Sequence, residues 1–197
     1  MTDTPLPAPD AALAALDSRR STPSRLLGEP GPDREALLRM LRSAVRVPDH
    51  GRLTPWRMLA IRGHDRMALG ERLAARQLER DPGSSPAALD KERMRFACAP
   101  LVVAVISSIT DTSRIPEQEQ LLSGGCVCFA LLQAAQALGY GAQWLTGWAA
   151  YDATIAQALG LAGHERLLGF IHIGTPTATA PERARPDPEQ LLGDWHG

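Results

Sequence analysis

Hydrophobic residues recur with two different spacings along the chain. Leu37, Met40, Leu41, Ala44 and Val45 return every three or four positions, as on one face of a helix that Asp33 can cap. Short apolar runs rich in β-branched residues are typical of strands. Together the two spacings predict further helices over 10–18 (with Asp10 as N-cap), 64–80, 86–95, 117–138 and 152–160, and strands over 56–62, 99–108, 142–147 and 166–176.

Two of these segments have no polar face. The run "APLVVAVISS" at 99–108 is nearly all apolar, which indicates a central strand buried on both faces. The helix 117–138 has an acidic first turn, which suits the positive end of a helix dipole. From Leu121 onward it is apolar or small all round, so we expect it to be buried, either in a domain core or across a subunit interface.

Helices and strands mix without strict βαβ alternation, which favours an α+β fold with helices packed around a central mixed β-sheet. The sequence shows no internal repeat and no Gly/Ser-rich linker, so we expect one domain over 1–197, with a flexible N-terminus at 1–9. The tail 177–197 has several prolines and little periodicity. It is long for a domain of this size, and we expect it to reach a partner subunit.

Composition narrows the class of protein. The 197 residues are 44% hydrophobic and 22% charged, with a formal net charge of −1, so no overall field would attract nucleic acid or an anionic membrane. The start of the chain lacks the pattern of a secretory signal, and no apolar run reaches the length that we expect of a membrane span. Three cysteines, an odd number in apolar surroundings, indicate a reducing cytoplasm.

Several kinds of chemistry are missing from the sequence. It contains no P-loop, no G-x-G-x-x-G after a strand and no G-x-S-x-G elbow. Cys126 and Cys128 are too close for a zinc pair, so we expect a buried, inert pair and no metal site. His172 lies in a predicted strand and His164 on the expected surface. If the protein is an enzyme, the chemistry should therefore belong to a bound organic cofactor.

Lys91 is the only lysine in a chain with 20 arginines, so any anion site must use arginine, backbone amides or hydroxyls. The string "SRRSTPSR" at 18–25 offers such groups just after a helix, because guanidinium donors match phosphate oxygens. The structural alternative is a solvated basic helix end.

Two further stretches combine unusual residues. The loop "RVPDHGRLTPWR" at 46–57 holds His50 and Trp56, which with Pro55 could form a flat wall for a planar heteroaromatic; the alternative is a surface loop with Trp56 filling the core. In "GYGAQWLTGW" at 139–148, glycines allow a ligand close to the backbone. There the alternative is a helix stop followed by a buried strand.

Taken in order, these pieces resemble the nitroreductase family, and most closely its compact bacterial members, which have a Pro-Asp-His loop. The resemblance covers the chain from about Arg19 to the tail. It is carried by "RRS" at 19–21, "RVPDHGRLTPW" at 46–56, "RFACAPLVVAV" at 95–105, the small-residue helix, "GYGAQW" at 139–144 and "GFIHIGTP" at 169–176.

The resemblance implies bound FMN at two sites in a homodimer, each lined by both chains. It assigns Arg19, Arg20 and Ser21 to the phosphate and ribityl end, Arg46 and His50 to the site of the other subunit, and Trp144, Leu145 and Thr146 to the ring. A segment associated with the nicotinamide nucleotide aligns with Ala134, Gln136, Ala137, Leu138 and Gly139. Leu145 replaces an arginine that is common in relatives, and Arg183 or Arg185 could add a phosphate contact.

The activity that this resemblance implies is hydride transfer from NADH or NADPH through flavin N5 to nitro compounds or quinone-like acceptors, in a ping-pong cycle. Two alternatives stay open at this point. One is a flavin enzyme of the same fold that acts on another small metabolite, and the other is a non-catalytic flavin-binding or storage protein.

Overall fold

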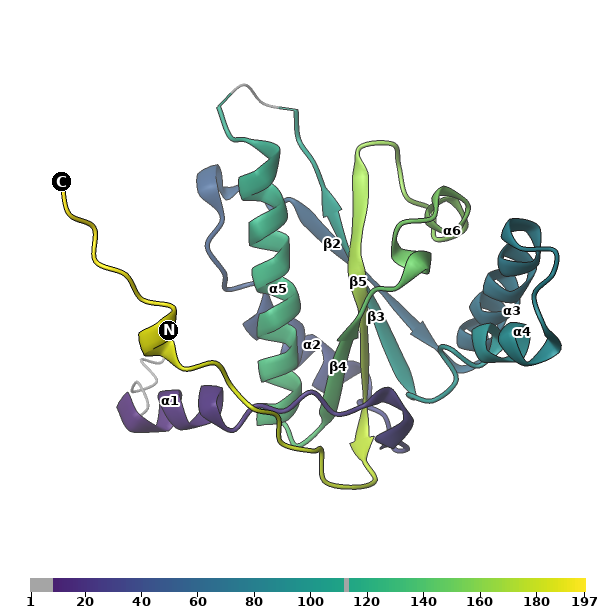
Figure 1. Ribbon diagram of the computed structural model, residues 1–197, viewed down its shortest axis with the longest axis horizontal. Coiled ribbons are helices and arrows are strands. Elements are labelled where there is room, and N and C mark those ends of the chain that lie inside the picture. The colour runs from purple at the N-terminus through teal and green to yellow at the C-terminus, as the bar shows by residue number, and fades with distance from the viewer. Residues whose placement is uncertain (1–8, 112–113) are drawn as a thin grey trace.

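The computed structural model describes residues 9–111 and 114–197 (Figure 1). All the long helices and strands expected from the sequence are present, most with ends shifted by one to three residues. The helices are α1 (Pro9–Asp17), α2 (Arg34–Ala44), α3 (Gly63–Arg80), α4 (Pro86–Arg93), α5 (Glu117–Ala137) and α6 (Ala153–Ala158), and the strands are β1 (Leu27–Gly28), β2 (Trp56–Arg62), β3 (Leu101–Ser108), β4 (Gly141–Leu145) and β5 (Glu165–Pro176).

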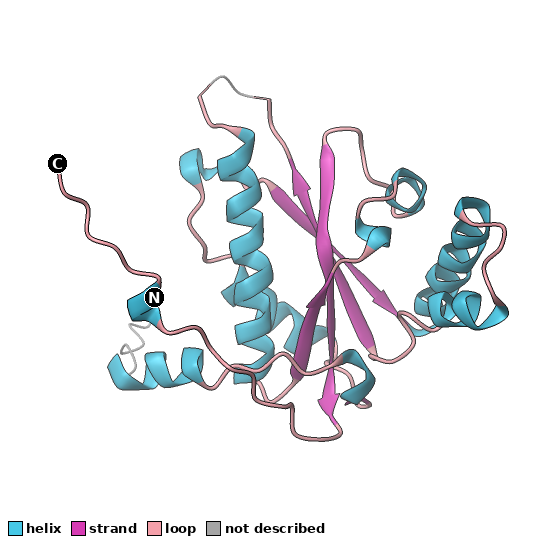
Figure 2. Cartoon of the chain, in the orientation of Figure 1, coloured by secondary structure: helices cyan, strands magenta, loops and turns pink. Residues whose placement is uncertain are grey.

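The α+β class is confirmed, but the sheet is not mixed. Every strand pairing within the described residues is antiparallel: β1, β3 and β4 pair with β5, and β2 pairs with β3. The sheet lies at the centre of the molecule with helices on both sides (Figure 2). The sequence pattern could not show strand direction, because an antiparallel and a parallel central strand are equally apolar.

Alternate residues of β3 enter two separate cores, because successive side chains of a strand point to opposite faces. Leu101, Val103 and Val105 pack with α2 and α5 on one face. Val102, Ala104 and Ile106 pack with α3, α6 and Phe96 on the other. The expectation that this strand is buried on both faces is therefore confirmed.

Within its own chain helix α5 is buried on one side only, so the alternative of burial across a subunit interface stays open for its other side. Its inner side packs on β3, β4 and β5, whereas Leu122, Cys126 and Phe129 are exposed at a spacing of three and four residues. The expected buried pair of cysteines is thus wrong for Cys126, because the two side chains leave the helix in different directions; Cys128 is buried, and burial raises the pKa of its thiol to about 12.

By length and composition alone, α5 is also the one helix among the described residues that is apolar enough to cross a membrane. Core helices of soluble proteins have the same properties, and 44% of the apolar window of α5 is buried inside this fold.

The local signals at the helix ends are only partly confirmed. Asp33 caps α2, since its carboxylate accepts a hydrogen bond of 2.7 Å from the Ala36 amide. Asp10 is not an N-cap: α1 begins at Pro9, a residue favoured at the first helical position, and Asp10 lies in the first turn. Except for Pro9, the N-terminal stretch expected to be flexible lies outside the described residues.

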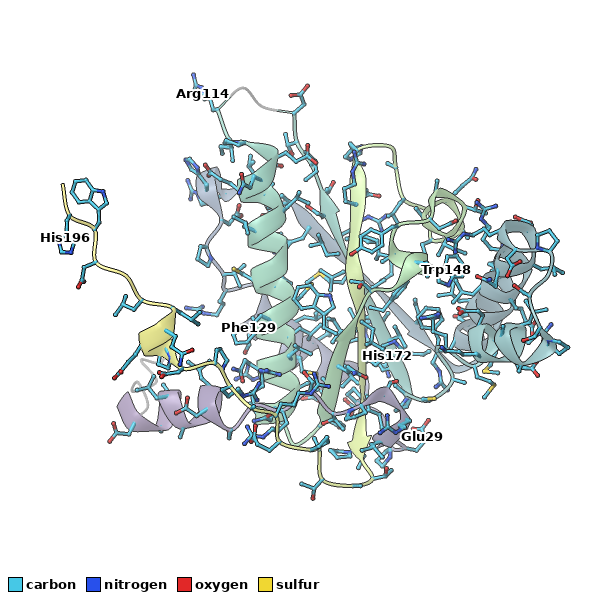
Figure 3. All side chains as sticks on the ribbon, in the orientation of Figure 1. Glu29, Arg114, Phe129, Trp148, His172 and His196 are labelled. Carbon is cyan, nitrogen blue, oxygen red and sulfur yellow. The ribbon has the colours of Figure 1, made fainter. Side chains whose placement is uncertain are left out.

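The C-terminal tail follows its own chain first and then leaves the body. Thr177 bonds to Leu26, and Glu182 forms an ion pair with Arg20. Beyond these contacts Leu191, Leu192 and Trp195 are 72%, 80% and 89% exposed, and Figure 3 shows His196 far from the rest of the molecule. The expectation that the tail reaches a partner subunit stays a prediction.

One histidine is fully enclosed in the second core. His172 lies in β5, as expected, and its ring stacks on Phe96 at 5.7 Å (Figure 3). Its Nδ1 has no hydrogen-bond partner in the described part of the chain. Burial, with the nearby positive charge of Arg95, lowers the pKa of His172 to about 4.

We expect His172 to make the protein acid-sensitive. The unfolded chain gains a proton at His172 near pH 6.5 but the folded chain only near pH 4, so the stability from a neutral His172 is complete above about pH 6.5 and is lost as the pH falls toward 4. His172→Phe should reduce the loss of unfolding free energy between about pH 7.5 and pH 5 by about 2 kcal/mol.

Urea unfolding of both proteins at the two pH values measures this difference. Glu165 does not interfere, because its hydrogen bond to Arg57 lowers its pKa to about 2 and its contribution is lost only below about pH 4.5. An unchanged pH dependence in the variant would show that His172 is not the group responsible.

Candidate functional site

The segment Arg20–Ser24 is docked against α5 and β4 through its alternate amides. The Arg20 N–H donates to Gln136 Oε1 at 3.0 Å, and the Thr22 N–H donates to the Ala142 carbonyl at 3.0 Å. The Ser24 N–H donates to Gln143 Oε1 at 2.6 Å. The amides of every second residue therefore face one wall, as they would at the edge of a sheet.

The residues between them present their polar groups away from that wall. The Ser21 N–H has no partner among residues 9–111 and 114–197, and the Ser21 hydroxyl accepts a bond of 3.2 Å from Arg19 Nη1. Arg185 Nη2 approaches the Arg19 carbonyl at 3.5 Å. The Arg19 guanidinium, the Ser21 hydroxyl and the Ser21 amide thus lie together, and donors of these kinds can bind a phosphate group, whereas Arg185 also pairs with Glu182 at 3.4 Å.

Arg20 differs from Arg19, because its own chain already engages its guanidinium. Its Nη1 donates to the carbonyls of Asp17 and Arg19 at 2.9 and 3.0 Å, and its Nη2 pairs with Glu182. Arg183 is exposed, and only its backbone amide makes a hydrogen bond, to Glu182. Of the two tail arginines considered, Arg185 is the one whose guanidinium lies near Arg19, and it too pairs with Glu182, at 3.4 Å.

The residues expected at the nicotinamide nucleotide do not share one surface. Gln136 and Gly139 line a cavity of about 410 Å³ together with Ser18, Arg20 and the tail at 178–180. Ala134, Ala137 and Leu138 line a different, much smaller recess beside Arg39 and Met40 of α2. The structure thus joins two of the five to the segment at 18–20 and places the other three in a separate recess.

The end of β4 forms a second group of expected site residues. Trp144 is 37% exposed and donates from Nε1 to the Leu168 carbonyl at 3.0 Å, while Leu145 and Thr146 are half-buried. Gly147 follows with φ 69°, ψ −175°, a conformation that only glycine adopts readily. The Gly147 conformation therefore sets the direction of the chain after β4, and within the described residues β4 pairs only with β5.

Behind this segment lies an arginine that the sequence analysis did not single out. Arg95 forms a two-pronged ion pair with the buried Glu92, at 2.7 and 2.6 Å, and no hydrogen bond of its Nη1 occurs within the described residues. A Cβ placed on Gly147 would lie 3.2 Å from this nitrogen. Arg95 is the first residue of the segment "RFACAPLVVAV" at 95–105, but only the fold shows that one of its nitrogens faces Gly147.

The Pro-Asp-His loop is held firmly against the start of α5. Asp49 accepts hydrogen bonds from the amides of Leu53 and Thr54 at 3.1 and 2.8 Å, and Ser123 Oγ donates to the Pro48 carbonyl at 2.7 Å. Gly51, Arg52 and Thr54 all have positive φ. Non-glycine residues persist in this region only where their surroundings fix them, which is common at functional sites.

His50 and Arg46, the two expected site residues on this loop, are both exposed. His50 Nδ1 lies 2.7 Å from Glu119 Oε2, so its Nε2 is the nitrogen left to meet a ligand. The Arg46 side chain makes no hydrogen bond or ion pair in the part of the chain that the structure describes. The idea that Trp56 fills the core is supported, since Trp56 packs on the first core.

Within one chain, the two groups of expected residues lie at opposite ends of α5. Glu119, beside His50, is in the first turn, and Gln136, beside Arg20, is in the last. At a rise of about 1.5 Å per residue these positions are separated by about 25 Å. A single chain therefore does not place His50 next to Arg19 and Ser21.

A further cleft, of about 640 Å³, contains none of the expected site residues. It lies between the start of α5, α6 and the first half of β5, and its walls are mainly apolar. Within the described residues, no group of three or more His, Cys, Asp or Glu side chains is arranged to hold a metal ion. The arginine- and amide-rich segment at 19–24 is thus the better candidate for an anionic ligand.

Comparison with known proteins agrees with this architecture. The model of the nitroreductase family matches residues 16–175. YdjA of Escherichia coli K12, named as an NAD(P)H nitroreductase, is 36% identical over 185 residues, covering 92% of this chain and 97% of the relative. A Haemophilus influenzae protein with the same activity in its name is 32% identical over 175 residues, covering 88% and 93%.

Solved structures share the fold. A nitroreductase-like protein of Bacillus cereus superposes with a TM-score of 0.80 at 20% identity, covering 98% of this chain and 99% of the other. A Desulfovibrio desulfuricans nitroreductase in complex with FMN gives a TM-score of 0.71 at 25% identity, covering 98% and 100%. The chain belongs to the nitroreductase family, and the class that follows from this membership is a flavin-dependent oxidoreductase.

We expect Asp49 to hold the strained loop in place. Asp49→Ala would remove two carboxylate hydrogen bonds to the backbone and should lower the free energy of unfolding by about 1–2 kcal/mol. The amides of Leu53 and Thr54 should exchange with deuterium faster, while those of β3 change less. Unchanged exchange at both amides would contradict the role given to Asp49.

Proposed function

We propose that this protein is an FMN-dependent oxidoreductase that transfers hydride from NADH or NADPH to nitro compounds or quinone-like acceptors in a ping-pong cycle. Bound FMN supplies hydride chemistry at its N5. The observation that carries the proposal is the segment Arg19–Ser24, whose docking leaves phosphate-type donors free on one side. The names of the relatives support the choice of NAD(P)H as reductant.

The donor set suits FMN at its two chemically different ends. Arg19, the Ser21 amide and hydroxyl, and Arg185 are suited to the dianionic phosphate and the adjoining ribityl chain. The backbone of Trp144, Leu145 and Thr146 is suited to the ring, with the free nitrogen of Arg95 close behind Gly147. A fixed positive charge there stabilises negative charge that develops on a bound ring.

The proposed enzyme is a homodimer, because one chain separates the two halves of the site. A two-fold axis perpendicular to α5 that passes beside its midpoint would place two copies of the helix antiparallel, and the His50 end of one chain would then lie beside the Arg19 end of the other. The exposed apolar stripe Leu122, Cys126 and Phe129 is centred on α5, where such an axis would pass. In this arrangement Arg46 and His50 serve the partner's flavin.

The proposed enzyme works in the cytoplasm and uses one binding face for both of its substrates. All three cysteines are free thiols, which is consistent with a reducing cytoplasm. The reductant and the acceptor bind one after the other at the same face of the site, beside the segment 144–147. No side chain of the protein has to act as a nucleophile. The chain's own task is to hold the reacting partners at a separation of about 3–3.5 Å.

We expect Arg19→Ala to weaken FMN binding roughly 10- to 100-fold, because the phosphate loses a charge-assisted hydrogen bond worth about 1.5–3 kcal/mol. Riboflavin, which lacks the phosphate, should bind the variant and the wild type alike. Arg25→Ala is the matched control, since Arg25 is exposed and its side chain makes no hydrogen bond or ion pair within the described residues. Titration of the apoprotein with both flavins measures the difference, and an equal loss for FMN and riboflavin would exclude Arg19 from the phosphate end.

We expect Phe129→Asp to convert a dimer into a monomer, because a charge would be buried in the interface proposed for α5. Sedimentation velocity measures the mass, and flavin content should fall with dimer content. Leu78→Asp on α3, where Leu78 is 45% exposed, is the control and should stay dimeric. A wild-type protein that is monomeric while it carries FMN would contradict the composite site.

Rapid mixing of the FMN-loaded protein with NADH and with NADPH tests the reaction itself. Loss of the yellow absorbance followed by its return on addition of a quinone or nitroaromatic is the expected result. A yellow protein that neither nucleotide bleaches would point to flavin storage. Bleaching without turnover of either acceptor class would point to an enzyme for another small metabolite.

A further inference from the structure

The side chain of Gln136 links α5 to the start of the anion-binding segment. Its Oε1 accepts the Arg20 N–H at 3.0 Å, and its Nε2 donates to Ser18 Oγ at 3.2 Å. The two residues that it holds lie more than 110 positions earlier in the sequence. Both polar atoms of the carboxamide are therefore used inside the protein.

Gln143 makes the corresponding contact at the other end of the segment. Its Oε1 accepts the Ser24 N–H at 2.6 Å, and between the two glutamines the Ala142 carbonyl accepts the Thr22 N–H. Pro23 has no N–H to donate. The three acceptors thus fix which edge of the extended segment faces inward. Between Arg20 and Ser24, the Ser21 amide is the one N–H without an acceptor in the part of the chain that the structure describes.

We propose that Gln136 is a positioning residue for the phosphate end of the site, with Gln143 as its counterpart, and not a contact of the nicotinamide nucleotide. The inference rests on the proposed binding of FMN. If the segment rotated by one residue, its other edge would face the wall, and Arg19 and Ser21, which share a face in either case, would both point away from the ligand side. Gln136 keeps them on the ligand side before any ligand arrives, which lowers the cost of ordering on binding.

Three variants separate this role from the nicotinamide contact. Gln136→Leu has a similar size but lacks both hydrogen-bonding atoms. Gln136→Glu keeps an acceptor for the Arg20 N–H. Gln118→Leu is the matched control, because Gln118 is exposed on the same helix and its side chain makes no hydrogen bond among the described residues.

The first measurement uses the apoprotein alone. Hydrogen exchange of the Arg20 amide should become roughly tenfold faster in Gln136→Leu, because a part-buried donor loses its acceptor. It should be close to the wild-type rate in Gln136→Glu and in Gln118→Leu. Equal rates in all four proteins would overturn the proposal, and a melting temperature for each variant checks that the fold itself is kept.

The second measurement compares ligands. Gln136→Leu should bind FMN roughly tenfold more weakly but riboflavin almost as the wild type does, and after saturation with FMN its KM for NADH or NADPH should be unchanged. Wild-type FMN affinity combined with a raised KM for the nucleotide would overturn the proposal in favour of the nicotinamide contact. A wild-type protein that binds neither flavin would instead refute the proposed function, and with it the phosphate role.

Discussion

Helix α5 is the physical constraint on which the rest of the structure depends. Its inner side closes the first core against three strands, so its position is fixed by burial of apolar surface. Its ends then determine where the two polar loops lie: the loop with His50 rests on the first turn, and Arg20 rests on the last. Because the helix is straight and rigid over this length, the two loops of one chain stay apart, and a site that needs both requires a second chain.

The loops themselves are positioned by hydrogen bonds to backbone amides. Asp49 holds two amides of a loop with positive φ values, and Gln136, Ala142 and Gln143 hold three amides of the segment that begins at Arg20. In both cases a buried or half-buried acceptor selects one backbone conformation and leaves chosen donors free. Such preorganisation lets a loop bind an anion without first paying for its own ordering.

Much of this architecture could be predicted from the sequence, and the reasons are specific. The β-branched run at 99–108 has too little polarity for an exposed face, and Asp33 stands directly before an apolar helical stripe. Both signals depend only on neighbouring residues, so they can be recognised without knowledge of the fold. The arginines at 19 and 20 were recognisable for a similar reason, since a chain with one lysine has few other means of binding phosphate.

The features of the fold and the candidate site that the sequence could not predict depend on contacts between residues far apart in the chain. The sequence does not distinguish Gln136 and Gln143 from other glutamines, because only the fold brings α5 and β4 to the segment at 20–24. The same holds for Arg95, whose Nη1 lies near Gly147 only in the folded chain. The exposure of Cys126 follows from the angle at which it leaves α5, which composition does not reveal. The antiparallel direction of the sheet likewise arises from pairing partners far apart in the chain.

The most direct test of the composite site is complementation between two defective chains. Arg19→Ala and His50→Ala proteins, each poor in FMN binding alone, are unfolded, mixed in equal amounts and refolded together. If each site takes Arg19 from one chain and His50 from the other, mixed dimers hold one intact site, and about one site in four should regain wild-type FMN affinity. Recovery of no high-affinity sites from verified mixed dimers would contradict the account, because both residues would then serve the same chain's flavin.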